Sequence, residues 1–291
     1  LFAGFVVLQY VVLATAWNIL GGYCGYVNFG TAAFFAMGAY STVALHKIGA
    51  NPDRYLSGTF AEFLTPLFPL SIPILVVMGG LVSALVGFGM GYLTLRLRGV
   101  FFAIATLAMA VVLQTLVINW DFVGGSRGAY IIRPDSVSFG PFTLSYIQYL
   151  FLVMLTLAVL ALWAARQIER SRLGFGFATI RDDELAAEAS GVPTLRLKLI
   201  ATALSGGLMG MAGAPLPYYI GYIEPSAAFG LPYAVFIILN VLPPMSAGGM
   251  LSMGRVTAIV FPVFLWMGAA VPARHRMAWI TFFALLQGFV A

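Results

Sequence analysis

Few of the residue types that carry out chemistry are present in this sequence. The 291 residues include one cysteine, Cys24, and two histidines, His46 and His275, which lie at the ends of apolar runs. A nucleophile needs a base within hydrogen-bond reach, and no Cys or His spacing typical of a metal site occurs. We therefore expect no catalytic residue, no metal and no cofactor, although serine and threonine are too common to exclude every dyad.

The densest group of charges lies between Arg166 and Lys198, with six basic and five acidic residues. Within it, residues 182–193 (DDELAAEASGVP) predict a short water-facing helix, because aspartates favour a helix N-terminus, glycine its C-terminus and proline the stop. The alanine-rich face is shallow enough for another protein to pack closely on it. The alternative is a solvated loop helix that holds two spans together. A helix this short is marginal alone, so the rest of the chain or a partner must pack on it.

Glycines cluster at two places inside apolar runs. The first is Gly21–Gly25, which leads to Asn28-Phe29-Gly30, and the second is Gly206–Gly213, which is followed by Pro215 and Pro217. Glycine and proline weaken helices, and interrupted helices at membrane depth line protein or a water-filled cavity. The alternative is ordinary helix packing, since G-x-x-x-G spacings put small residues on one face. The candidate helix breaks on a translocation path are Gly25, Asn28, Gly30, Gly206, Gly207 and Gly210.

The elements that must position these segments are membrane helices. Hydrophobic residues make up 61% of the chain and charged residues 9%, against about 25% charged in soluble domains. Because about 20 apolar residues cross a bilayer, we predict an all-α polytopic membrane protein of about eight or nine transmembrane helices. We expect one domain over 1–291, truncated at both ends. The predicted spans are 1–20, 26–46, 67–95, 99–118, 146–165, 197–220, 231–249, 256–271 and 278–291.

The basic residues predict which side of the membrane each loop faces. If the Arg96–Arg98 turn and residues 166–198 are cytoplasmic, nine Lys and Arg residues lie inside and six lie outside, which is the usual bias. Residues 47–66 and 119–145 are then outside. No predicted helix centre carries a charged residue or histidine, and such groups are costly in a bilayer. A proton relay within these spans is therefore not expected.

Several blocks, in order along the chain, resemble the LivM-type branched-chain amino acid permeases of ABC importers. Ala186, Ala187 and Gly191 keep the spacing of the importers' E-A-A…G coupling loop, with Leu185 at the usual glutamate position and Glu184 one place earlier. The similarity covers about residues 10–230, whereas residues 240–291 diverge from the family pattern. The matching blocks are 22–30 with 32–40, 95–107, 119–128, 181–192 and, more briefly, 219–223.

The resemblance implies a permease subunit in the bacterial inner membrane that imports branched-chain or other hydrophobic amino acids, or a related small solute such as urea. The sequence contains no G-x-x-x-x-G-K-[ST] motif, so ATP would be hydrolysed by separate ABC ATPase subunits. Further implied partners are a second related permease subunit and a periplasmic solute-binding protein that docks near 119–145. The implied ATPase-coupling residues are Asp182, Asp183, Glu184, Ala186, Ala187 and Gly191.

Two other classes of function remain open from the residues themselves. The first is a self-contained secondary carrier or channel for a small neutral solute, in which backbone groups would coordinate any coupled Na⁺. The second is an intramembrane enzyme, for which no nucleophile–base pair is evident. Dependence of uptake on ATP and on an ATPase partner separates the importer from the carrier.

Overall fold

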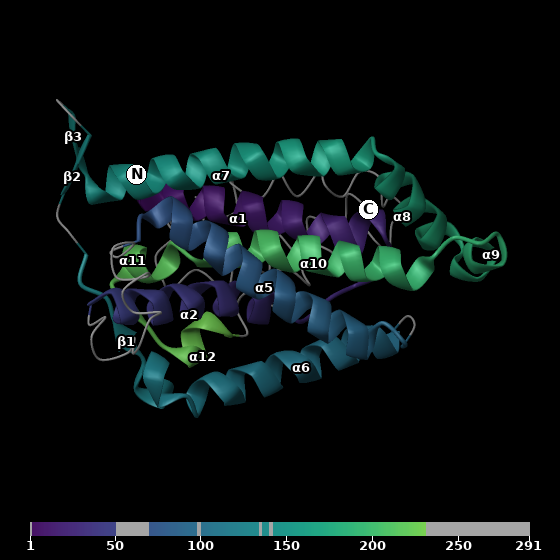
Figure 1. Cartoon of the computed structure of the whole chain (residues 1–291), viewed down its shortest axis with the longest axis horizontal. Helices are drawn as coiled ribbons and strands as arrows, with labels where there is room; N and C mark the ends of the chain where they lie inside the picture. The colour runs from purple at the N-terminus through teal and green to yellow at the C-terminus, as the bar shows by residue number, and fades with distance from the viewer. Residues whose placement is uncertain (1, 51–69, 98–99, 134–135, 140–141, 231–291) are drawn as a thin grey trace, which may run out of the picture.

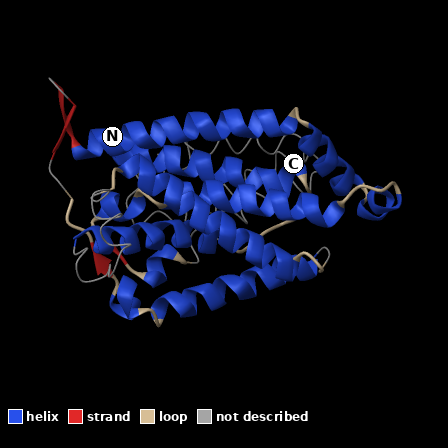
Figure 2. Cartoon of the chain, in the orientation of Figure 1, coloured by secondary structure: helices blue, strands red, loops and turns tan. Residues whose placement is uncertain are grey.

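The computed structural model describes residues 2–50, 70–97, 100–133, 136–139 and 142–230. Within these ranges the chain is a bundle of long helices with two short antiparallel strand pairs, β1–β4 and β2–β3 (Figure 2). The α-helices are α1 (Phe2–Asn18), α2 (Thr31–Ala50), α5 (Ile72–Thr94), α6 (Val100–Ile118), α7 (Tyr146–Glu169), α8 (Arg172–Asp182), α9 (Glu184–Ala189), α10 (Thr194–Gly213), α11 (Leu216–Ile220) and α12 (Pro225–Ala228). The shorter elements are the π-helix η1 (Ile19–Tyr23), the 3-10 turns η3 (Asp121–Val123) and η4 (Gly125–Arg127), and the strands β1 (Ala129–Tyr130), β2 (Ser136–Phe139), β3 (Phe142–Ser145) and β4 (Tyr222–Ile223).

Five helical segments in the described ranges are long and apolar enough to cross a membrane. The polytopic all-α class predicted from composition is therefore confirmed. The predicted spans 231–249, 256–271 and 278–291 lie outside the described residues. The five segments are Phe2–Tyr23, Ile72–Thr94, Phe101–Ile118, Tyr146–Glu169 and Thr194–Ile220.

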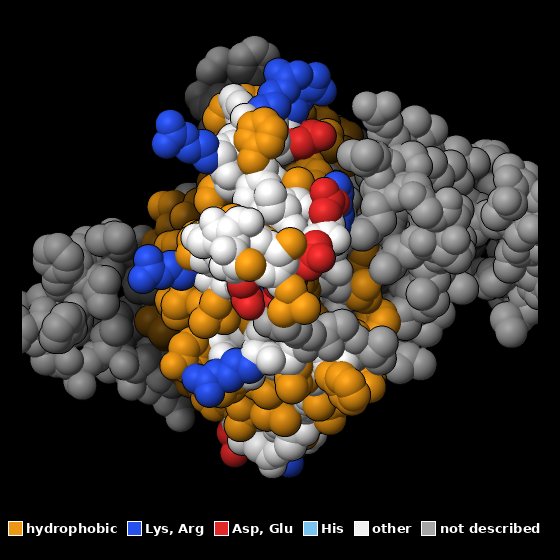
Figure 3. Space-filling view, turned by 90° about the vertical axis from the view of Figure 1, so that its right-hand side faces the viewer, with side chains coloured by type: hydrophobic (Ala, Val, Ile, Leu, Met, Phe, Trp, Pro, Cys, Tyr) orange, Lys and Arg blue, Asp and Glu red, His pale blue; other side chains and the backbone are white. Residues whose placement is uncertain are grey.

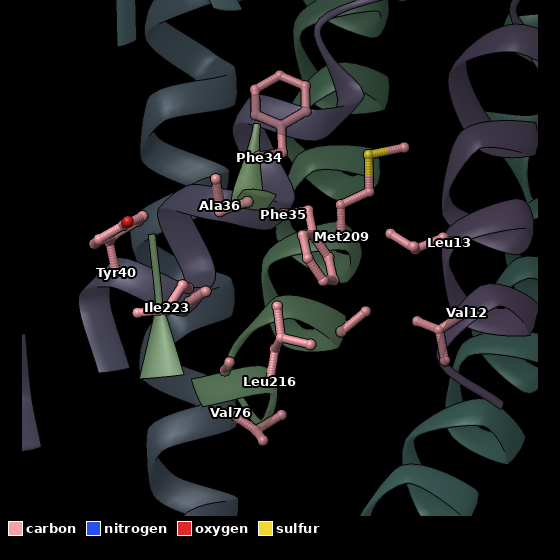
Figure 4. Close-up of a cluster of buried hydrophobic side chains, with 14 of the residues drawn as sticks. Val12, Leu13, Phe34, Phe35, Ala36, Tyr40, Val76, Met209, Leu216 and Ile223 are labelled. Atoms are coloured by element: carbon pink, nitrogen blue, oxygen red, sulfur yellow. The ribbon is translucent and has the colours of Figure 1, made fainter. Parts of the chain in front are cut away.

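Helix α10 is the centre of the bundle and the most enclosed of these five segments. It packs against α5, α2 and α1, while α7 packs on α1 (Figure 1). Met209 of α10 lies in the main hydrophobic core with Phe34 and Phe35 of α2 and Val12 and Leu13 of α1 (Figure 4). By contrast, α5, α6 and α7 expose large apolar side chains, as helices that face lipid do.

The glycines of α10 serve close helix packing, which corrects the predicted break at Gly206, Gly207 and Gly210. Helix α10 runs without interruption through all three residues and ends at Gly213, ahead of Pro215. A methyl group on Gly210 would lie 2.2 Å from Ser83 Oγ of α5. Glycine is needed here because neighbouring helices approach its backbone.

Helices α2 and α10 also approach each other closely. A methyl group on Gly38 of α2 would lie 2.1 Å from the carbonyl oxygen of Gly210. We expect Gly38→Ala to destabilise the protein by about 1–3 kcal/mol, the usual cost of overpacking. The matched control is Gly89→Ala in α5, where an added methyl group meets no atom within 4 Å. Unfolding of the purified variants in SDS measures both, and equal losses would contradict the packing explanation.

The bundle has two chemically different ends. The first, which we call the α9 end, carries α8, α9 and the turn after α5, and the second, the α11 end, carries α11 and all four strands (Figure 1). Figure 3 looks onto the α9 end, where acidic and basic side chains gather. The structure thus brings the Arg96 turn and the 166–198 connection to the same end, as the orientation argument requires. The described basic residues of these two segments are Arg96, Arg166, Arg170, Arg172, Arg181, Arg196 and Lys198.

Helix α2 begins part-way along the bundle, because the chain is not helical between η1 and Thr31 (Figure 1). The predicted span 26–46 is therefore wrong at its start, and the observed helix is Thr31–Ala50. Residues 24–30, which we call the break segment, run from the α9 end into the interior of the bundle.

Candidate coupling helix and helix break

Helix α9 is capped at both ends by its own sequence. The Asp183 carboxylate accepts hydrogen bonds from the backbone N–H groups of Leu185, at 2.9 Å, and Ala186, at 3.0 Å. At the other end Gly191 adopts φ +81°, which glycine tolerates best. The predicted caps are therefore confirmed. The predicted single helix from 182 is corrected, because Asp182 ends α8 and α9 starts at Glu184.

One face of α9 is open and the other packs on the protein itself. Leu185 is 63% exposed and Ala187 is 5% exposed, and Ala186 is exposed like Leu185. Consecutive residues of a helix point in different directions, so the two neighbouring alanines have opposite surroundings. Of the six predicted coupling residues, Asp182, Asp183, Ala186 and Gly191 are exposed, Glu184 is half-buried and Ala187 is buried.

Glu184 is held in a polar cluster that joins three parts of the chain. Its carboxylate accepts a hydrogen bond from the Lys198 ammonium group at 2.7 Å and another from the Tyr26 hydroxyl. Lys198 Nζ also lies 3.3 Å from the Leu95 carbonyl oxygen and 3.3 Å from Tyr26 Oη. We call Glu184, Lys198 and Tyr26 the polar cluster.

Sequence reasoning missed this cluster. Lys198 lies early in α10 and Tyr26 in the break segment, and Lys198 is only 3% exposed. The available signal was that Lys198 is one of two lysines in the chain and lies close to an apolar run. A charged group that is removed from water needs a partner, but the sequence does not identify which one.

The break segment is held by side chains rather than by a helical ladder. Gly25 has φ +79°, and the Asn28 side-chain oxygen accepts a hydrogen bond from the Gly30 N–H at 2.7 Å. The Phe29 N–H donates to Thr106 Oγ1 of α6 at 3.1 Å. These side chains satisfy backbone groups that leave the helix, which explains how irregular backbone persists inside an apolar bundle. The interruption predicted at Gly25, Asn28 and Gly30 is present.

Two polar atoms beside this interruption have no hydrogen-bond partner. These are Asn28 Nδ2 and Thr31 Oγ1, and both side chains are buried. Buried polar atoms are normally paired with protein or water. A water molecule or a polar solute group beside the break segment would therefore be stabilised by hydrogen bonds to these two atoms.

Metal chemistry has no obvious location in the part of the chain that the structure describes. No group of three or more His, Cys, Asp or Glu side chains within it could hold a metal ion. The α9 end offers a surface for contact with another protein. The break segment offers polar backbone and amide groups that can form hydrogen bonds.

This geometry defines the class of the protein. It is a polytopic α-helical membrane protein with a capped loop helix at one end and a helix break beside that helix. The chain belongs to the family described as "Branched-chain amino acid transport system / permease component", which matches residues 3–242. This confirms the resemblance inferred from the sequence blocks, and the match ends near residue 240, where the sequence departs from the family pattern.

Two curated relatives are both named "High-affinity branched-chain amino acid transport system permease protein LivM". The protein from Salmonella typhimurium is 28% identical over 256 residues, which cover 80% of this chain and 55% of the relative. The protein from Escherichia coli is 28% identical over 280 residues, which cover 88% of this chain and 59% of the relative. The chain thus spans little more than half the length of these relatives. No solved structure matches it.

Proposed function

We propose that this chain is the transmembrane permease subunit of an ABC importer in the bacterial inner membrane, acting as one permease domain. Its substrates would be branched-chain or other hydrophobic amino acids, the class named in the two LivM relatives. Separate ABC ATPase subunits would dock on α9 and supply the energy. The observation that carries the proposal is the open face of α9, a capped helix at the charged end of the bundle.

The exposure of Leu185 supports a protein partner at α9. A leucine that is 63% exposed at the charged end of a membrane protein gains free energy when another surface covers it. Helix α9 is also held firmly on its other side. Besides the Glu184–Lys198 pair, Thr194 Oγ1 donates a hydrogen bond to the Glu188 carboxylate at 2.8 Å. Helix α9 is therefore anchored to the rest of the chain, so that a partner bound to its open face can exert force on it.

The break segment supports a role in translocation. Its irregular backbone and the unpaired atoms Asn28 Nδ2 and Thr31 Oγ1 offer hydrogen bonds inside an otherwise apolar bundle. A zwitterionic amino acid needs such groups when it leaves water. Discontinuous helices form substrate sites in other transporters for the same reason. We propose Gly25, Asn28 and Gly30 as part of the solute path.

The α11 end offers a separate surface for a periplasmic solute-binding protein. Ile132 is 88% exposed, and the ring of the nearby Tyr130 lies 4.6 Å from that of Tyr222 across the β1–β4 pair. Exposed aromatic and apolar residues are enriched in protein contacts. A second, related permease subunit would complete the transporter across the lipid-facing sides of the bundle.

The decisive experiment compares one apolar-to-acidic change at each end. Leu185→Asp is expected to abolish co-purification of co-expressed ABC ATPase subunits and to abolish ATP-driven amino acid uptake. The control is Ile132→Asp at the other end of the bundle, where Ile132 is 88% exposed, and it is expected to retain the ATPases. Uptake that persists in vesicles without ATP, or ATPase binding that is unchanged by Leu185→Asp, would favour a self-contained carrier.

A further inference from the structure

We propose that the polar cluster is the link through which movement of α9 reaches the break segment. The inference rests on the proposed function, because it assumes that an ATPase moves α9. Its first support is geometric. Glu184 is the first residue of α9 and Tyr26 is in the break segment, and their side chains are joined by a hydrogen bond and by a shared contact with Lys198.

A second, independent contact joins the same two segments. Arg181, at the end of α8, packs directly on Gly25, because a methyl group on Gly25 would lie 3.0 Å from Arg181 Cγ and 3.4 Å from Arg181 Cα. Two consecutive residues of the break segment therefore touch the α8–α9 connection, one by packing and one by hydrogen bonding. Displacement of that connection has to displace the break segment or separate both contacts.

The hydrophobic packing groups the same parts together. Among the described residues, the buried apolar side chains form two clusters, and the smaller one combines η1 and the break segment with α8, the start of α10, Leu95 after α5 and Phe102 of α6. Phe177 and Ile180 of α8 belong to it together with Cys24 and Tyr26. The larger cluster contains the main core of α1, α2, α7 and α10. The break segment thus shares a core with α8, whereas α2, which follows it, belongs to the main bundle.

This division explains why the break segment would move. Gly25 lies next to Tyr26 and adopts φ +79°, and the segment has no helical ladder to resist bending. A displacement that enters through Glu184 is passed to Tyr26, while Thr31 and the rest of α2 stay with the main core. The break segment, with Asn28 and its unpaired amide nitrogen, is where the smaller cluster meets the main core, because Val27 packs against the larger cluster.

The labelling rate of the Cys24 thiol can report this movement. Cys24 is the single cysteine of the sequence, is buried, and lies two residues from Tyr26 in the smaller core. The test uses the transporter assembled with its ATPases in vesicles, and measures the rate at which N-ethylmaleimide labels Cys24 with and without ATP. In the wild type, ATP is expected to raise the labelling rate.

Tyr26→Phe removes the hydroxyl but keeps the ring in the smaller core. We expect this variant to bind the ATPases and hydrolyse ATP, to lose the ATP-dependent labelling of Cys24, and to import about tenfold less solute per ATP, as loss of a hydrogen bond to a charged group predicts. Glu184→Gln should behave in the same way. The matched control is Tyr23→Phe, whose hydroxyl instead lies 3.5 Å from the Ala165 carbonyl oxygen and whose loss should preserve coupling.

Each contrary result overturns the link. If Tyr26→Phe keeps wild-type labelling and uptake, the hydroxyl transmits nothing. If it loses ATPase binding, the cluster only holds α9 in place. If wild-type Cys24 does not respond to ATP, the break segment does not follow α9. Failure of the wild-type chain to bind ATPases or to import solute with ATP refutes the proposed function instead, so the two ideas are tested separately.

Discussion

Replacing Lys198 by methionine is expected to destabilise the protein by about 3 kcal/mol, the lower end of the range for removing one partner of a buried ion pair. The change removes the Lys198 ammonium group, 2.7 Å away, from the Glu184 carboxylate, whose side chain is 14% exposed. It also removes the donor to the Leu95 carbonyl oxygen. The lower end applies because water still reaches Glu184. Unfolding of the purified variant in SDS measures the loss.

The other lysine of the sequence provides the control. Lys47 Nζ donates to the Phe122 carbonyl oxygen at 2.9 Å, and losing that one hydrogen bond from a charged group through Lys47→Met should cost about 1.5 kcal/mol. The double variant Lys198→Met with Glu184→Gln should recover part of the loss, because it also removes the negative charge that faces Lys198. If Lys198→Met costs no more than Lys47→Met, the ion pair does not stabilise the α9 end.

Gly25→Ala is expected to reduce amino acid uptake far more than Gly191→Ala. Both glycines have positive φ, +79° and +81°, so both variants carry a backbone cost of about 1–2 kcal/mol. An added methyl group at Gly25 also presses on Arg181, whereas at Gly191 it meets no atom within 4 Å. The difference between the two variants therefore isolates the contact between the break segment and α8.

Uptake in vesicles and ATPase co-purification should be measured together on these two glycine variants. We expect Gly191→Ala to keep most of both activities. We expect Gly25→Ala to keep ATPase binding while uptake falls by about tenfold or more, equivalent to about 1.4 kcal/mol. Equal effects of the two substitutions on uptake would show that backbone strain alone explains them and that the Arg181 contact has no role.

Features that depend on neighbouring residues were predictable from the sequence. The ends of α9 are set by caps at Asp183 and Gly191 and by Pro193, which has no backbone N–H to donate. These effects act over only a few residues. The end of α10 at Gly213, ahead of Pro215, was not predicted, because the predicted span ran on to residue 220. In the described ranges, the long apolar runs predicted helices at nearly the observed positions, because crossing a bilayer sets their length and composition.

Features that depend on tertiary contacts were not predictable. Gly25 and Gly207 look alike in sequence, yet Gly25 allows a positive φ whereas Gly207 lies within a straight, closely packed helix. Ala186 and Ala187 differ only in the direction in which they point from the axis of α9. Which of them is exposed depends on which side of α9 packs on the rest of the chain. Lys198 and Tyr26 are 172 residues apart, so no local pattern connects them.

We propose that energy enters this protein through the open face of α9. A photo-crosslinking amino acid placed at Leu185 in the assembled transporter tests it most directly, with one at Ile132 as the comparison. We predict an ATP-sensitive crosslink from position 185 to an ABC ATPase and none from position 132. Absence of any ATPase crosslink from position 185, in a transporter that imports amino acids with ATP, would show that the energy does not enter through α9.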